Sequence, residues 1–174
     1  MKNRIITIVA LAITIISCNQ KNKQEETVKI ESTTEVVGQS SFSIDEIVKN
    51  YLAIKNSLAT DDSDAAADAG KALSETMAKT GMEKVSSDQM EAYMSIADDV
   101  KEHAEHIGDN GGKIEHQREH FVTLSKDMDD LIQLFGTNQK LYLDFCPMAD
   151  NNNGAVWISE TKEITNPYFG KDMA

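Results

Sequence analysis

Hydrophobic residues recur at spacings of three and four between residues 44 and 135, which is the period of helices with one apolar face. The first of these patterns follows Ser43 and ends near Thr60, and Ser43 with Glu46 has the spacing of a capping box. Its apolar positions are Ile44, Ile47, Tyr51, Ile54 and Leu58. The pattern therefore predicts an amphipathic helix that begins the folded part of the chain.

Three further helices follow in the same way. Residues 64–79 are rich in alanine, the strongest helix former, and their small side chains allow a neighbouring helix to approach closely. A third helix is expected to begin at Ser86 or Ser87, and a fourth begins near Lys113, after a turn cluster at 108–112. Four helices with short connections favour an all-α fold, an antiparallel four-helix bundle.

The hydrophobic pattern changes near the C-terminus. Alternating residues at 141–145 predict a short strand, and a second short strand is expected at 155–159. The tail is too short to fold alone. It carries the aromatic residues Trp157, Tyr168 and Phe169. We therefore expect a two-stranded or irregular C-terminal tail that docks on the helices through these rings.

The N-terminal pattern is of a different kind. Lys2 and Arg4 precede an apolar run from Ile5 to Ile16, which is shorter than the ~20 residues that span a bilayer. A positive start before a short apolar run is typical of a secretory signal peptide. The sequence Ile-Ile-Ser-Cys that ends at Cys18 resembles the bacterial lipobox. The resemblance implies cleavage before Cys18 and a lipid on its sulfur; the alternative is an ordinary signal peptide with an incidental cysteine.

These patterns divide the chain into three parts. Residues 1–17 are predicted to be a signal peptide, and residues 18–41 a lipidated cysteine with a polar, flexible tether. Residues 42–174 form the helical domain with its docked tail. We expect a protein of the cell envelope, on the periplasmic side, that is attached to the membrane by a lipid anchor. The sequence leaves open whether this is the inner or the outer membrane.

The charge of the chain restricts its partners. Its 17 basic and 29 acidic residues give a formal net charge of -12. Removal of residues 1–17 also removes Lys2 and Arg4, so the mature chain has 15 minus 29, or -14. Such a chain is not expected to bind nucleic acid, whose recognition depends on neutralised phosphates. The charge attracts cations, or serves only solubility.

Several sequence blocks resemble a known family. They are YLAIKNSL at 51–58, HQREHFVTLS at 116–125, FCPMADNNNGAVWIS at 145–159 and ITNPYFG at 164–170. Together they resemble the lipoproteins that contain the domain of unknown function 3347, which is related to C-terminal segments of the periplasmic adaptors of heavy-metal efflux pumps. The resemblance implies a four-helix bundle and, by association, copper or silver handling. It implies no enzymatic activity.

The chain departs from this family at its end. Family members usually continue after NPYFG through a methionine to a second cysteine, whereas here Met173 is followed only by Ala174. This departure argues against a site with two thiolates in the tail. It leaves Cys146 without a cysteine partner once Cys18 carries a lipid.

One set of residues suggests a soft-metal site. His116 and His120 are four apart and project from one side of the fourth helix. If the tail covers that side, it brings Cys146 and Met148 close to both imidazoles, with Met173 as an additional ligand. Thiolate, thioether and imidazole ligands suit Cu(I) or Ag(I). The alternative is that the histidines bond to tail carbonyls and Cys146 packs as a small apolar group.

Two further histidines leave two interpretations open. His103 and His106 lie three apart on the third helix, and the short turn brings His106 near His116. They either extend the histidine cluster or are solvated surface residues. No catalytic motif accompanies them, so we expect a protein that is not an enzyme. The main alternative to a metal-binding module is a metal-free interaction module that docks an envelope partner.

Overall fold

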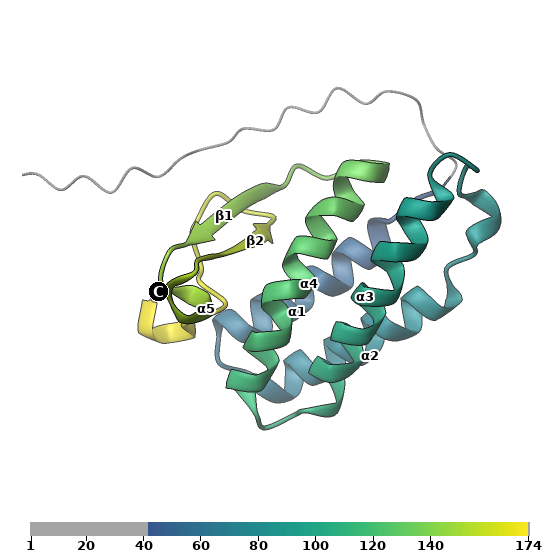
Figure 1. Ribbon diagram of the computed structural model, residues 1–174. Helices are drawn as coiled ribbons and strands as arrows, with labels where there is room; N and C mark the ends of the chain where they lie inside the picture. Colours follow the sequence, from purple (N-terminus) through teal and green to yellow (C-terminus); the bar gives the residue numbers. More distant parts are fainter. Residues whose placement is uncertain (1–41, 174) are drawn as a thin grey trace, which may run out of the picture.

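The computed structural model describes residues 42–173, so the predicted signal peptide, Cys18 and the tether lie outside the described residues. This part of the chain is mostly helical and ends in a small antiparallel sheet (Figure 1). Its four long helices are α1 (Asp45–Ala59), α2 (Ser63–Lys79), α3 (Met90–Asp109) and α4 (Ile114–Phe135). The four helices predicted from the periodicity of the sequence are therefore present.

Two helix starts differ from the prediction. The segment before α3 forms a short 3-10 helix, η1 (Met82–Lys84), and Ser86 donates its hydroxyl hydrogen to Gln89 Oε1 at 2.7 Å. Consequently α3 begins at Met90 and not at Ser86 or Ser87. The expected capping box is also wrong. Ser43 accepts from the backbone nitrogen of Asp45 at 3.2 Å, and Glu46 pairs with Lys49.

Consecutive helices pack side by side, α1 on α2, α2 on α3 and α3 on α4. The contact between α2 and α3 is especially close, because a Cβ atom at Gly70 would lie 2.8 Å from both the carbonyl oxygen of Ala104 and the backbone nitrogen of Gly108. A Cβ at Gly108 would in turn lie 2.9 Å from the Lys71 side chain. The small residues of α2 therefore do allow close packing, as the sequence predicted.

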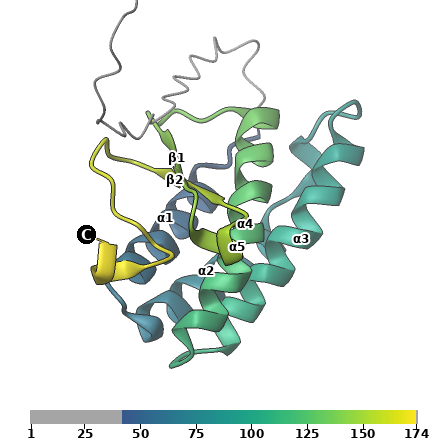
Figure 2. The same ribbon diagram turned by 60° about the vertical axis from the view of Figure 1, so that its left-hand side comes forward.

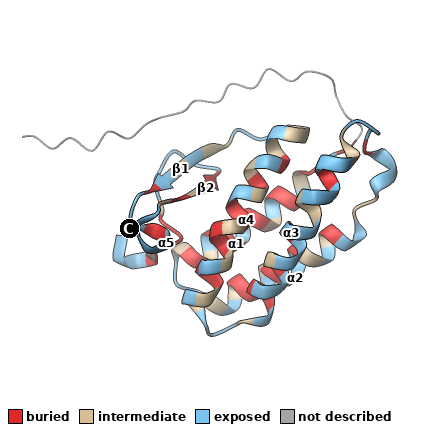
Figure 3. Ribbon diagram, in the orientation of Figure 1, coloured by how far each residue is buried: buried red, intermediate tan, exposed pale blue. Residues whose placement is uncertain are grey.

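The buried residues of the four helices, red in Figure 3, lie mainly where the helices face one another. The methionines of the helices differ in burial, and Met77 and Met128 are buried. Met90 is only partly buried. Met94 is 51% exposed. On the same helix Val100 is fully buried, and Ile96 and Ala97 are partly buried.

The tail forms the predicted hairpin. Strand β1 (Tyr142–Cys146) pairs antiparallel with β2 (Ala155–Ser159), with Cys146 opposite Ala155. The connection contains the short helical turn α5 (Ala149–Asn152), in which Asp150 and Asn151 have positive φ angles of 50° and 54°. Aspartate and asparagine are the residues other than glycine that most readily adopt this conformation. The chain then ends in a 3-10 helix, η2 (Gly170–Met173).

The hairpin packs on α4 and α1 (Figure 2). Trp157 and Tyr168 are buried, and their rings meet edge to face with centroids 5.9 Å apart. The buried hydroxyl of Tyr51 links the layers, since it bonds to Ser125 Oγ at 2.9 Å and accepts from the backbone nitrogen of Ile158 at 3.0 Å. Docking of the tail through its aromatic residues is thus confirmed for these two rings.

A second polar link joins the tail to α1. The side chain of Lys55 is 1% exposed and forms an ion pair with Glu160 at 2.9 Å. Glu160 also accepts from Asn56 Nδ2 at 2.8 Å.

Within residues 42–173, no helix is both long enough and apolar enough to cross a membrane.

Candidate metal centre

A short loop between α3 and α4 brings three histidines together. Gly112 has a φ angle of +80°, which favours glycine, and its backbone nitrogen donates to Ser63 Oγ at 2.8 Å. The buried Gln117 donates to the carbonyl oxygens of Ser63 at 2.9 Å and Ile107 at 3.1 Å. It also accepts from Ser63 Oγ at 2.7 Å. These bonds fix the start of α4 against the end of α3.

The three histidines form a compact cluster. His106 comes from the last turns of α3, and His116 and His120 come from the first turns of α4. Each offers a ring nitrogen, and the three nitrogens lie within 4.8 Å of one another. In a tetrahedral site with metal–nitrogen bonds of about 2.1 Å, the nitrogens are about 3.4 Å apart. Small side-chain rotations therefore suffice to close this group, the histidine cluster, around one ion.

The ring geometry shows how the cluster is organised around His120. The rings of His106 and His120 are stacked with centroids 4.3 Å apart and an interplanar angle of 3°. The ring of His116 stands edge-on to His120 at 4.7 Å. His106 is exposed, whereas His116 and His120 are half-buried. The cluster is therefore open to solvent on one side, where an ion can enter.

Each histidine of the cluster has a polar neighbour outside it. His116 Nδ1 lies 3.2 Å from Glu119 Oε2, and His106 Nε2 lies 4.0 Å from Glu102 Oε1. His120 Nδ1 lies 3.1 Å from Nδ1 of His103. Partners of this kind orient metal-binding imidazoles and determine which ring nitrogen carries the hydrogen.

The electrostatic environment favours the neutral form of His120 and of its neighbour His103. Burial, followed by the neighbouring His106, His116 and His103, lowers the pKa of His120 below its usual value. Burial is also the main cause that lowers the pKa of His103, against the opposing charges of Glu102 and Asp99. Since only the unprotonated nitrogen binds a metal ion, these shifts leave His120 ready to bind at neutral pH.

The structure groups the predicted ligands differently from the sequence. His116 and His120 do lie together, and His106 joins them. Cys146 is a free thiol, 4% exposed, at the end of β1, and it does not belong to the histidine cluster. Met148 follows β1 and is 47% exposed, while Met173 lies in η2 and is 40% exposed.

The physical reason is that the tail covers a different side of α4. Arg118 Nε donates to the carbonyl oxygen of Pro167 at 2.9 Å, and the ring of Phe121 packs on Tyr168 at 5.7 Å. His116 and His120 instead face α3, which supplies His103 and His106. The flank of the histidines is therefore covered by the neighbouring helix, whereas the sequence analysis assigned that cover to the tail.

A partly buried carboxyl group also lies on α4. Asp127 on α4 is half-buried, and its Oδ2 atom is buried without a hydrogen-bond partner. Burial, together with the charges of Asp99 and Asp130, raises the pKa of Asp127 to about 6. The sequence gives no sign that Asp127 is buried, because a charged position beside an apolar stripe usually indicates a solvated face.

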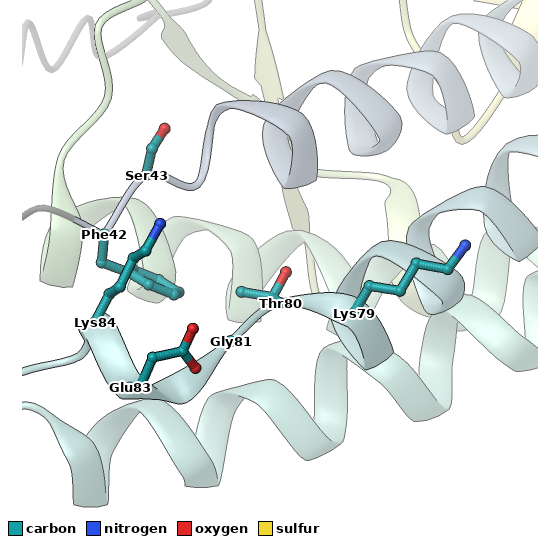
Figure 4. Close-up of a pocket in the computed structure, with 7 residues that line it drawn as sticks. All are labelled: Phe42, Ser43, Lys79, Thr80, Gly81, Glu83 and Lys84. Atoms are coloured by element: carbon teal, nitrogen blue, oxygen red, sulfur yellow. The ribbon is translucent and has the colours of Figure 1, made fainter.

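A polar pocket lies elsewhere on the described part of the chain. A pocket of about 330 Å³ is found where the end of α2 meets the residues before α1 (Figure 4). Its charged lining residues are Lys79, Lys84 and Glu83. It shares no residue with the histidine cluster and brings together no set of metal ligands.

Comparison with known proteins gives one match. The family described as "Protein of unknown function (DUF3347)" matches residues 47–140, which extend from α1 through α4. The matched region includes the blocks at 51–58 and 116–125 and ends before the cysteine and NPYFG blocks of the tail. No curated protein and no solved structure matches the chain. Because the match covers more than half of the chain, the protein belongs to the DUF3347 family of proteins of unknown function.

Proposed function

We propose that this protein is a lipid-anchored binding protein of the cell envelope whose four-helix bundle binds a transition-metal ion, with copper as the first candidate. The observation that carries the proposal is the convergence of His106, His116 and His120 within 4.8 Å of one another. No reaction is assigned to the site, which lacks a positioned nucleophile. A net charge of -14 for the mature chain adds a general attraction for cations.

The donor set decides which ion to test first. Imidazole nitrogens suit copper, zinc and nickel, and Cu²⁺ has the highest affinity among the common divalent ions. The soft ions Cu(I) and Ag(I) were expected on the assumption that Cys146 and Met148 join the site. With the three imidazoles as the ligand set, we propose Cu²⁺ as the preferred ion and keep Cu(I) as the competing candidate.

Metal competition tests this proposal. The purified protein is titrated with Cu²⁺ against a chromogenic chelator, and with Cu(I) under reducing, oxygen-free conditions. We expect tight Cu²⁺ binding that is lost when His116 and His120 are both replaced by alanine, and that weakens as the pH falls because the imidazoles become protonated. Cys146→Ser is the matched control and is expected to bind Cu²⁺ like the wild type.

The competing outcomes are distinct. If the double alanine variant binds Cu²⁺ as tightly as the wild type, the histidine cluster is not the site. If Cys146→Ser loses Cu(I) affinity and the double variant does not, the sulfur ligands of the tail hold the ion instead.

The membrane anchor is tested separately at Cys18. The lipobox-like sequence at 15–18 supports lipidation of this residue. We expect that Cys18→Ala abolishes acyl labelling and releases the protein from membrane fractions. Unchanged labelling in this variant would refute the anchor and leave the metal site unaffected.

A second candidate function rests on the outer face of the hairpin. Leu143, Phe145 and Met148 lie within a six-residue segment and are exposed by 37%, 61% and 47%, respectively. Exposed apolar side chains of this size suit a docking surface for an envelope protein. A photo-crosslinker at Phe145 in intact cells is expected to give one discrete adduct. Absence of any adduct there, with a functional metal site, would leave the binding module as the sole proposal.

A further inference from the structure

His103 lies beside the histidine cluster and outside its ligand set. Its Nδ1 atom is 3.1 Å from Nδ1 of His120, and the two ring centroids are 5.3 Å apart. The three nitrogens of the cluster lie within 4.8 Å of one another, and His103 is not among them. A hydrogen bond between the two rings explains this contact without making His103 a ligand of the ion.

We propose that His103 is a positioning residue, which accepts a hydrogen bond from Nδ1–H of His120 and so leaves Nε2 of His120 free to bind the ion. This inference rests on the proposed metal site and specifies how the protein prepares it. Two imidazole nitrogens form a hydrogen bond only when one carries the hydrogen and the other a lone pair. The short contact therefore fixes the tautomers of both rings together.

The direction of this bond follows from the proposed metal site. Nδ1 of His120 is the atom engaged by His103, so Nε2 is its remaining nitrogen for an ion. A neutral imidazole that binds an ion through Nε2 carries its hydrogen on Nδ1. His120 therefore donates, and Nδ1 of His103 accepts with its lone pair.

The same arrangement recurs at His116. Its Nδ1 lies 3.2 Å from the carboxylate of Glu119, which can only accept a hydrogen, so Nε2 of His116 is likewise free. Glu119 is, however, 75% exposed in its side chain. His103 is half-buried between the helices, where its ring is held more firmly. We therefore expect His103 to contribute more to the prepared geometry than Glu119.

Nuclear magnetic resonance of the metal-free protein tests the tautomer directly. Long-range proton–nitrogen correlations of the imidazole rings, recorded above pH 7.5, show which nitrogen of His120 carries the hydrogen. We expect Nδ1–H for His120 in the wild type and in His103→Gln, whose amide oxygen also accepts, and we expect a shift toward Nε2–H in His103→Leu. A wild-type His120 with its hydrogen on Nε2 overturns the proposal, whatever its metal affinity.

Cu²⁺ affinity supplies the second measurement. Loss of an orienting partner typically weakens metal binding by about 10- to 100-fold. We expect a loss of this size in His103→Leu and near wild-type affinity in His103→Gln, with Glu105→Gln as an exposed control on the same helix. Pulsed electron paramagnetic resonance should count the same number of bound imidazoles in the wild type and in His103→Leu.

The results separate this inference from the proposed function. If the wild type binds no Cu²⁺, the metal site and the positioning role both fall. If the wild type binds and His103→Leu binds equally well, only the positioning role falls. If His103→Leu loses one bound imidazole and His103→Gln does not restore affinity, His103 is itself a ligand and the proposal is overturned.

Discussion

Replacing Asp127 by asparagine is expected to stabilise the protein at neutral pH. Asp127 lies on α4 with its Oδ2 atom buried and without a hydrogen-bond partner. Burial is the main cause of its raised pKa, and the negative charge of Asp99 on α3 contributes further. Ionisation of this carboxyl is therefore disfavoured in the folded state. Asparagine has nearly the same shape and removes the charge.

The raised pKa gives the magnitude. An increase from 3.8 to about 6 is about 2.2 pH units, which at about 1.36 kcal/mol per unit corresponds to an upper value of about 3 kcal/mol. Asp127 is only half-buried, so solvent screens part of this cost. We therefore expect Asp127→Asn to raise the free energy of unfolding by about 1 kcal/mol at pH 7.5.

The pH dependence has a definite sign. Between pH 3.8 and about 6 the folded state holds a proton on Asp127 that the unfolded state has lost. The contribution of this group to the free energy of unfolding therefore falls as the pH rises through that window. Below the window the carboxyl is protonated in both states. The advantage of Asp127→Asn over the wild type should accordingly be full above pH 6 and vanish below pH 3.8.

Urea unfolding of both proteins across this pH range measures the difference. Asp68→Asn is a matched control, because it removes the same charge from an exposed position of α2. A gain of about 1 kcal/mol raises the melting temperature by about 3 to 5 °C in a domain of this size. Equal stability of Asp127→Asn and the wild type at pH 7.5, or a gain that persists at pH 3.5, would refute the conclusion that ionised Asp127 destabilises the folded state.

Three further predictions concern packing and the tail. Gly70→Ala should lower the free energy of unfolding by about 1–3 kcal/mol, because its Cβ would lie 2.8 Å from the main chain of α3. Gly111→Ala is the control: a Cβ there has no contact closer than 3.4 Å, so thermal melts should show nearly unchanged stability. Arg118→Leu should lower the free energy of unfolding by about 2–4 kcal/mol, since the buried guanidinium bonds to the tail and to the end of α1. Unchanged hydrogen exchange in the tail of this variant would contradict the prediction. The buried thiol of Cys146 should react slowly with alkylating reagents until denaturant is added, and rapid native modification would show that β1 opens readily.

The local sequence accounts for most of the secondary structure. The strand at 155–159 was predicted with its observed bounds. The helix expected over 64–79 begins one residue earlier, at Ser63. Asp62 caps this start, because its side chain accepts a hydrogen bond from the backbone nitrogen of Ala65. These elements depend on interactions between near neighbours in sequence. The start of α3 was misplaced because the serine pair resembles a helix cap, while the chain uses it in a turn.

The spacing of residues in the sequence predicts only part of the candidate metal site. The spacing of His116 and His120 placed both on one face of a helix, and the short turn made His106 a neighbour of His116. The spacing could not decide whether the third helix or the tail covers that face. The contact of His103 with His120 and the unpartnered carboxylate of Asp127 depend on the rotation of α3 against α4.

The sequence by itself thus determined the periodic helices, the hairpin strands, the acidic charge and the family to which the chain belongs. These follow from the spacing of apolar residues, from turn residues and from motifs, which are all local properties. Only the tertiary structure decided that imidazoles from two helices meet while Cys146 lies in the tail sheet. That choice depends on which flank of α4 each neighbour buries, and Arg118, fixed to Pro167 and Leu58, holds the tail on the flank away from the histidines.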